Sequence, residues 1–109
     1  MSSRRFARAR KERKRVALER IAILMGEAER AAVSGEIDRA DRYALLARRV
    51  GMRYNAPITR QWRMRVCRGC ERYLSPGKTA RVRVTDRVLV ITCLRCGRAW
   101  RMPFKRDAR

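Results

Sequence analysis

The chain has 109 residues, enough for one domain or two very small ones. It contains 30 Lys and Arg residues against 10 Asp and Glu residues, and its formal net charge is +20. Charge repulsion of this size opposes compaction unless a polyanion relieves it, so the composition indicates a nucleic-acid partner. No apolar run approaches the ~20 residues that cross a bilayer, and the basic start lacks the apolar core of a secretory signal. We therefore expect no membrane partner and a reducing, cytoplasmic location.

The first predicted elements are a basic, flexible N-terminus over residues 1–15 and a helix from about residue 12 to residue 33. The basic run is expected to fold on RNA. The helix is predicted because apolar residues recur at three- and four-residue spacing along one face. These residues are Ala17, Leu18, Ile21, Leu24, Met25, Ala28, Ala31 and Ala32. Ser34-Gly35 interrupts the pattern and predicts a tight turn.

A second helix follows, with Asp38 as its expected N-cap, and together the two predict an antiparallel helical hairpin over residues 16–54. Its expected buried face consists of Ala40, Tyr43, Ala44, Ala47, Val50 and Tyr54. Val16, Ile23 and Leu46 lie off both stripes. Apolar surface is therefore left over for a protein partner.

Residues 55–63 are predicted to be a connector, because Asn55 and Pro57 disfavour continuation of the helix. Residues 64–104 are assigned to a C-terminal unit, and within it the segments 81–85 and 88–92, on either side of Asp86-Arg87, alternate with a period of two. This alternation predicts a small antiparallel sheet. Its apolar side holds Val82, Val84, Leu89 and Ile91, and its mixed side holds Arg81, Arg83, Thr85, Val88, Val90 and Thr92. Residues 105–109 are assigned to a tail.

Four cysteines form two C-x-x-C pairs, Cys67/Cys70 and Cys93/Cys96, and the chain has no histidine. Each pair makes a tight turn that points two thiolates at one spot, and Gly69 and Gly97 are expected to permit the backbone angles required there. Two such turns joined by a β-hairpin predict a structural Zn²⁺ site of four cysteines. A thioredoxin-like redox pair would need an α/β fold that nothing here supplies. An iron–sulfur cluster remains an alternative.

The sequence offers no catalytic constellation. Four thiolates would close the metal site to water and substrate. No histidine is present as a base, and neither Asp86 nor Asp107 has an acidic neighbour in sequence. We therefore expect no catalytic residues in this polypeptide.

With these elements in place, the sequence resembles a known family. The segments "YALLARRVGMRYN", "CRGCERYLSPGKTARVRV" and "CLRCGRAW" resemble archaeal ribonuclease P protein component 4 and the related eukaryotic nuclear subunits. The resemblance covers residues 16 to 101. Its most specific part is a C-x-x-C followed by a leucine, a Pro-Gly pair and an Arg/Val string.

The resemblance implies a small α+β fold, with a two-helix hairpin, a connector and a four-cysteine zinc ribbon. It also implies a non-catalytic subunit of the ribonucleoprotein that removes the 5′ leader from precursor tRNA. Such a subunit binds and stabilises the specificity domain of the catalytic ribonuclease P RNA together with protein component 1, and it meets precursor tRNA indirectly. Component 1, an Sm-like barrel, would dock on the hairpin. The candidate docking residues are Leu18, Ile21, Leu24, Met25, Ala40, Tyr43, Ala47 and Val50.

Basic residues cluster in and before the predicted ribbon, and we expect them to contact mainly phosphate and sugar groups of folded RNA. The candidates are Arg48, Arg49, Arg53, Arg60, Arg63, Arg65, Arg68, Arg72, Lys78, Arg81, Arg83, Arg95, Arg98 and Arg101. An independent zinc-ribbon protein of ribosomal or transcription type is the alternative function. A free-standing nuclease is the third.

Overall fold

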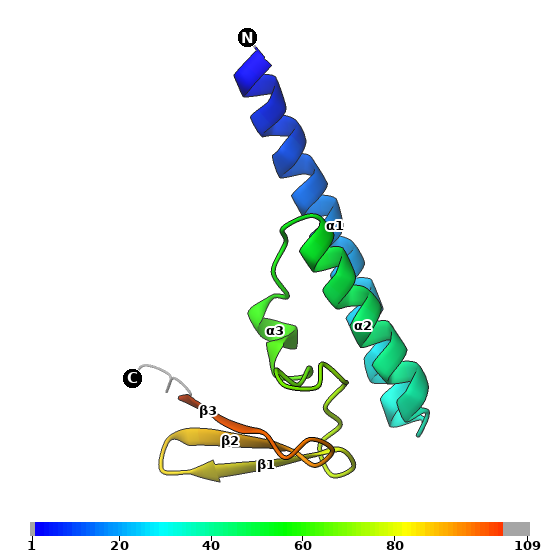
Figure 1. The fold of residues 1–109 in the computed structure, drawn as a ribbon, viewed down its shortest axis with the longest axis vertical. Helices are drawn as coiled ribbons and strands as arrows, with labels where there is room; N and C mark the ends of the chain where they lie inside the picture. The colour runs from blue at the N-terminus through cyan, green and yellow to red at the C-terminus, as the bar shows by residue number, and fades with distance from the viewer. Residues whose placement is uncertain (1, 104–109) are drawn as a thin grey trace. The chain divides into compact units, whose positions relative to one another are not determined.

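The structure is a computed structural model that describes residues 2–103, and it divides into two compact units between Arg63 and Met64. The first unit contains helices α1 (Ser2–Val33), α2 (Ile37–Arg53) and α3 (Arg60–Arg63) (Figure 1). The second contains strands β1 (Ala80–Thr85), β2 (Val88–Cys93) and β3 (Ala99–Pro103). The expected small α+β fold is confirmed. Among residues 2–103, no helix is both long and apolar enough to span a membrane.

Helix α1 begins at Ser2, so it includes the basic run that we expected to be flexible. The flexibility of residues 1–15 in the free chain stays a prediction, and the helix over residues 2–15 has a local reason. The run is rich in Ala, Arg and Lys, which have high helix propensity. Arg15 also forms ion pairs with Glu12, one turn before it, and with Glu19 at 2.9 Å, one turn after it.

A Schellman motif ends α1. Gly35 has a φ of +86°, which an L-residue with a side chain adopts only at a cost. The Gly35 N–H donates to Ala32 O at 3.0 Å, and the Glu36 N–H donates to Ala31 O at 2.8 Å. These two bonds satisfy carbonyls that the end of a helix leaves without partners. The predicted turn at Ser34-Gly35 is therefore confirmed.

The boundaries of α2 differ slightly from those expected. Its N-cap is Glu36, which makes no capping hydrogen bond through its side chain, and Asp38 lies in the first turn instead of at the cap. A carboxylate there still interacts favourably with the helix dipole. After the helix, Asn55 adopts a φ of +53°, and the Ala56 N–H donates to Gly51 O at 2.8 Å. Gly51 is required for this close approach, since a Cβ there would lie 2.6 Å from Ala56 O.

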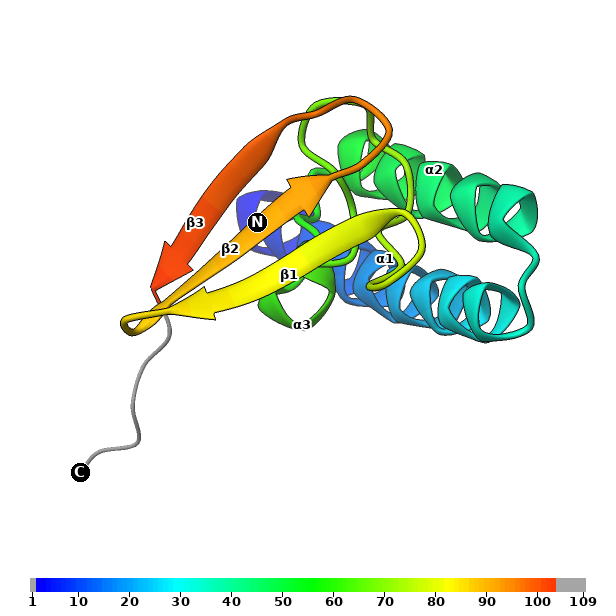
Figure 2. The same ribbon diagram turned by 90° about the horizontal axis from the view of Figure 1, so that it is seen from below.

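The interface between α1 and α2 is built mainly from alanine. The two helices run antiparallel and side by side over the length of α2 (Figures 1 and 2). The buried alanines are Ala17, Ala28, Ala31, Ala32, Ala40, Ala44 and Ala47. Ile21 and Met25 are the large side chains of this interface, and both are fully buried. Small residues let the two backbones approach closely, so larger apolar side chains must point elsewhere.

This packing corrects our assignment of the docking surface. Four of the eight candidate docking residues are buried inside the hairpin, so they have no surface to offer a partner. They are Ile21, Met25, Ala40 and Ala47. The other four are half-buried: Leu18, Leu24, Tyr43 and Val50. Periodicity identified the apolar stripes correctly, but the two stripes cover each other.

The sheet has the strand order β1-β2-β3 and is antiparallel throughout, with β2 in the centre (Figure 2). Thr85 pairs with Val88, which leaves a two-residue turn as expected. Asp86 and Arg87 in this turn have φ values of +41° and +70°, the left-handed geometry that matches the twist of a tight hairpin. Strand β3 was not predicted, because its five residues show only weak alternation.

The predicted two faces of the sheet are confirmed by the strand register, which pairs Val82 with Ile91 and Val84 with Leu89. Ile91 is buried in the ribbon core, and Leu89 packs against that core. Trp100 and Met102 of β3 pack against the same core. The β1 edge of the apolar face is uncovered, since Val82 is 41% exposed and Val84 is 64% exposed.

We predict that Met25→Ala destabilises the hairpin by about 2–5 kcal/mol, because it removes a fully buried side chain and leaves a cavity. Urea denaturation followed by the helical circular dichroism signal measures this change. Ile23→Ala is the matched control on the same helix, and we expect a change within about 0.5 kcal/mol because Ile23 is 64% exposed. Equal losses from the two variants would show that this packing is wrong.

Candidate metal centre

The two C-x-x-C segments fold into the same backbone turn. The Cys67 N–H donates to Arg72 O at 3.0 Å, and the Cys93 N–H donates to Arg98 O at 2.8 Å. Each bond joins the first cysteine of a pair to the fifth residue after it. Because both turns are closed in the same way, each can present two sulfurs on one side.

A second shared bond closes each turn from within. The Glu71 N–H donates to Cys67 O at 3.0 Å, and the Gly97 N–H donates to Cys93 O at 2.9 Å. The donor residue has a positive φ in both turns, +64° at Glu71 and +83° at Gly97. The expected role of Gly97 is therefore confirmed, whereas in the first turn the left-handed position belongs to Glu71 and not to Gly69.

Gly69 is needed for space. A Cβ at this position would lie 3.0 Å from Cδ of Arg98 and 3.2 Å from Sγ of Cys96. Both atoms belong to the second turn, so the backbone of the first turn runs directly against it. The absence of a side chain at Gly69 thus lets the two turns converge.

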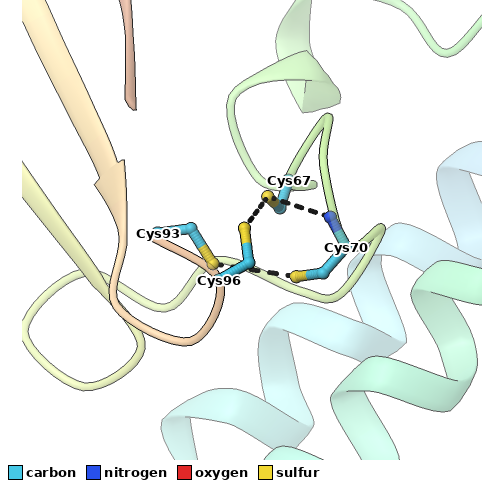
Figure 3. A group of neighbouring side chains, drawn as sticks. All are labelled: Cys67, Cys70, Cys93 and Cys96. Atoms are coloured by element: carbon cyan, nitrogen blue, oxygen red, sulfur yellow. Dashed lines mark hydrogen bonds between the residues drawn. The ribbon is translucent and has the colours of Figure 1, made fainter. Parts of the chain in front are cut away.

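The four sulfur atoms meet at one point (Figure 3), and all lie within 4.8 Å of one another. The Sγ atoms of Cys67 and Cys96 are 3.5 Å apart, and those of Cys70 and Cys93 are 3.7 Å apart. A tetrahedral site with metal–sulfur bonds of ~2.3 Å has sulfur–sulfur distances of about 3.8 Å. The observed spacing therefore fits a single metal ion held by four thiolates, as predicted.

The electrostatics of the cluster are compatible with a bound cation. Burial raises the pKa of the Cys67 thiol, but the N–H groups of Cys70 and Gly69 donate to its sulfur and bring the pKa down to about 7. Burial raises the pKa of Cys70 to about 11, reinforced by the sulfurs of Cys93 and Cys67. One negative charge thus opposes the next. Four thiolates at this spacing would repel one another, and a bound cation would offset that repulsion.

The donor set narrows the choice of metal. Four sulfurs in tetrahedral arrangement are typical of Zn²⁺ or of iron in a sulfur site. The cysteines are free of disulfides, as metal ligation requires. A site with four protein ligands has no open coordination position, so a bound ion would hold the ribbon together without supplying chemistry to a substrate. Among residues 2–103, this cluster is the group of side chains positioned to hold a metal.

A hydrogen-bonded anchor that the sequence analysis missed supports the first turn. Thr79 is buried, and its Oγ1 accepts from the Ser75 N–H at 2.8 Å and donates to Tyr73 O at 3.1 Å. The Leu94 N–H donates to Thr79 O at 2.9 Å, which ties this loop to the second turn. The sequence signal was a Ser and a Thr four residues apart around Pro76-Gly77, a pattern typical of a side-chain-closed turn.

Two predicted RNA-binding arginines make internal contacts. Arg65 Nη1 donates to the Tyr73 hydroxyl at 3.2 Å, and Arg95 Nη2 donates to Tyr73 O at 2.8 Å. Tyr73 is itself buried. Both arginines therefore stabilise the ribbon around Tyr73, a structural role that charge clustering alone did not indicate. Their role in RNA binding stays a prediction.

The other seven basic candidates of the ribbon are all exposed: Arg68, Arg72, Lys78, Arg81, Arg83, Arg98 and Arg101. The sheet register brings three of them onto one face. Arg83 and Arg101 both pair with Val90 from opposite sides, and Arg81 follows on the same side of β1. Arg68 lies elsewhere, with its guanidinium 5.9 Å from the Trp100 ring centroid.

The remaining candidates belong to the first unit. Arg49, Arg53 and Arg63 are exposed, and Arg48 is half-buried. The guanidinium of Arg53 lies 5.6 Å from the Tyr54 ring centroid. The side chain of Arg60 falls outside the described part of the structure.

We predict that Cys93→Ser abolishes stoichiometric metal binding and unfolds the ribbon. A structural zinc site contributes an apparent 10–16 kcal/mol or so, which exceeds the stability of so small a unit. Metal analysis of the purified chain and the β-sheet amide signals measure both effects, while the helical signal of the separate hairpin should persist. Leu94→Ser, at the adjacent exposed position, is the control and should retain the metal. A Cys93→Ser variant with one ion per chain would contradict the site.

Comparison with known proteins places this geometry in a family. Residues 20–97 match the sequence model of the RNAse P Rpr2/Rpp21/SNM1 subunit domain. The chain is 43% identical over 100 residues to ribonuclease P protein component 4 of Methanocaldococcus jannaschii. This alignment covers 89% of this chain and 78% of the relative. It is 40% identical over 97 residues to the protein of that name in Methanococcus maripaludis strain C5, covering 86% and 88%.

Two solved structures are also similar to this chain. A chain in the "cryo-EM structure of archaeal Ribonuclease P with mature tRNA" is similar with a TM-score of 0.75 and 44% identity, covering 84% of this chain and 78% of that one. A chain described as "Pfu Rpp21 structure and assignments" is similar with a TM-score of 0.56 and 38% identity, covering 81% and 99%. Because the family match covers the C-terminal part of α1, all of α2, the connector and all four cysteines, this chain belongs to the RNAse P Rpr2/Rpp21/SNM1 subunit family.

Proposed function

We propose that this chain is a non-catalytic protein subunit of ribonuclease P, the ribonucleoprotein that removes the 5′ leader from precursor tRNA. In this role it binds and stabilises the specificity domain of the catalytic RNA together with protein component 1. The similarity to a chain of archaeal ribonuclease P, at a TM-score of 0.75 and 44% identity, is the observation that carries the proposal.

The proposed metal is one structural Zn²⁺, because Zn²⁺ prefers closed tetrahedral sites of four thiolates. The ion would fix the two cysteine turns, and through them the sheet that carries the arginines. The proposed location is the cytoplasm, since a thiolate site needs cysteines that are kept reduced.

The proposed RNA-binding surface of the ribbon is the face of the sheet that carries Arg81, Arg83 and Arg101. The register places the latter two on opposite sides of Val90, and all three side chains are exposed. Guanidinium groups in this arrangement suit the phosphates of folded RNA, where contacts fix position more than sequence.

The proposed docking surface for component 1 is the exposed apolar surface of the hairpin. Val16 is 38% exposed, Ile23 is 64% exposed and Leu46 is 39% exposed. These three residues lie outside the packed stripes, and the alanine-rich interface leaves them exposed. A protein partner that buries them would gain free energy from the apolar area removed from water.

Reconstitution tests the function directly. We expect that omitting this chain from a mixture of ribonuclease P RNA and the other protein subunits slows cleavage of precursor tRNA at limiting Mg²⁺. Adding it back should restore the rate, whereas the chain alone, free of RNA, should cleave nothing. Unchanged cleavage without the chain, or cleavage by the chain alone, would refute the proposal.

Variants at the two proposed surfaces separate their roles. Arg83→Gln with Arg101→Gln should lower the salt dependence of RNA binding by about two units of log K against log salt, because each phosphate contact contributes about one. Ile23→Ala with Leu46→Ala should weaken component 1 binding about tenfold or more, since apolar burial contributes roughly 1–2 kcal/mol per side chain. Each pair should leave the other interaction unchanged. Crossed effects would contradict the assignment of the two surfaces.

A further inference from the structure

The N-terminal half of α1 is a helix without cover from α2. Helix α1 has 32 residues and α2 has 17, which corresponds to lengths of about 48 Å and 26 Å. Figure 1 shows α2 alongside only the C-terminal half of α1. Every side chain from Ser3 to Val16 is exposed. The part of this half that carries the charge, residues 4–15, is called the basic segment below, and it precedes residues 20–97, which match the family.

The basic segment carries eight basic residues and one acidic residue, Glu12. Four of the basic residues follow one side of the helix at spacings of four, three and four: Arg4, Arg8, Lys11 and Arg15. Three others lie on a second side, Arg10, Arg13 and Lys14, and the eighth, Arg5, lies on neither of these two sides. At 3.6 residues per turn, the centres of these two sides are about 140° apart around the helix axis.

Acidic residues neutralise little of this charge. Glu12 pairs with Arg15, which also pairs with Glu19. Charges on two sides of an uncovered helix repel one another along its whole length, so a ligand that stabilises the segment must bring anions to both sides. A flat anionic surface or a single phosphate row could serve only one of them.

A groove of nucleic acid brings a phosphate row to each side of a helix. An α-helix with its side chains is about 10–12 Å wide, close to the ~12 Å width of an open major groove. The major groove of a continuous RNA duplex is too narrow and deep to admit it, so the duplex must be interrupted. We propose that the basic segment is a second RNA-binding element, which lies in the major groove of an RNA stem where a bulge or internal loop widens it.

The positive surface continues from this segment onto α2. Lys14 and Arg48 line one hollow of the first unit, together with Met52 and Ile58. RNA held along the basic segment would therefore meet a further arginine at the point where α2 begins to cover α1. The inference rests on the proposed RNA-binding role, but it concerns an element outside the ribbon and outside residues 20–97, which match the family model.

An anionic membrane surface is the rival occupant. A helix that lies on a membrane needs a continuous apolar side opposite its charges. Within the basic segment the large apolar side chain is Phe6, which is 60% exposed, and basic residues lie on both sides of the helix. The observations therefore favour a groove over a lipid surface.

Binding of the full chain to three RNA probes at several salt concentrations tests the inference. The probes are a stem with one bulge, the same stem without it, and a single strand of equal length. Arg4→Gln with Arg8→Gln alters one side of the helix, and Arg10→Gln with Lys14→Gln alters the other. On the bulged stem we expect each pair to lower the salt slope by about two, and all four changes to lower it by about four. The parent chain should bind the bulged stem most tightly.

The matched control is Arg20→Gln with Arg42→Gln, which removes the same charge from exposed positions of the hairpin and should leave the slope unchanged. Circular dichroism should show equal helix content in all variants, because Gln is a good helix former. Equal effects of control and test variants, an effect from only one side of the helix, or no preference for the bulged stem would overturn the inference. So would binding to phosphatidylserine vesicles as tight as to the bulged stem.

The ribbon variant Arg83→Gln with Arg101→Gln separates this inference from the proposed function. If that variant lowers the salt slope and the basic-segment variants do not, the basic segment is not an RNA-binding element and the ribbon surface stands. If neither the ribbon variant nor the basic-segment variants change the salt slope of RNA binding, the proposed RNA-binding role of the chain is wrong.

Discussion

The convergence of four sulfur atoms is the constraint on which the C-terminal unit depends. All four lie within 4.8 Å of one another, and thiolates at that distance repel unless a cation lies between them. The ribbon has few fully buried large side chains, with Tyr73, Leu74 and Ile91 as the main ones. Units with a core this small usually need a metal, disulfides or a partner, and the cysteine cluster is placed where a bound ion would supply that stability. The two cysteine turns are closed by the same pair of backbone hydrogen bonds, so one local backbone conformation occurs twice in the ribbon.

The sheet transmits that constraint to the surface. Cys93 ends β2, the central strand, so the register of both neighbouring strands is set close to the metal centre. Once the register is fixed, alternation of side chains decides which residues share a face. For this reason Arg101 of β3 shares a face with Arg81 and Arg83 of β1, although the two strands are separated in sequence by β2. A slip of one residue would move these arginines to the apolar side.

The helical unit is organised by a different principle. Alanines at the interface let α1 and α2 approach closely, and this close packing leaves larger apolar side chains such as Ile23 and Leu46 on the outside. In such a hairpin the facing sides of the two helices are buried, and apolar side chains are exposed on other sides. The N-terminal half of α1 has no such packing and depends on helix propensity, local ion pairs and continuity with the packed half. Its charge then becomes the property that a ligand can recognise.

The sequence by itself determined the four-cysteine cluster of the candidate metal site, the two-helix hairpin, the turn at Asp86-Arg87 and the register of β1 with β2. These features follow from local spacing: two C-x-x-C pairs without histidine, a period of 3.6, and a period of two. Only the tertiary structure decided which apolar residues are core and which are surface. Periodicity shows that Met25 and its neighbours form an apolar stripe, but it does not show which part of the protein covers that stripe. It also showed that Arg65 and Arg95 hold Tyr73, and that Gly69 makes room for the second turn. Such contacts join residues distant in sequence, so no local pattern could reveal them.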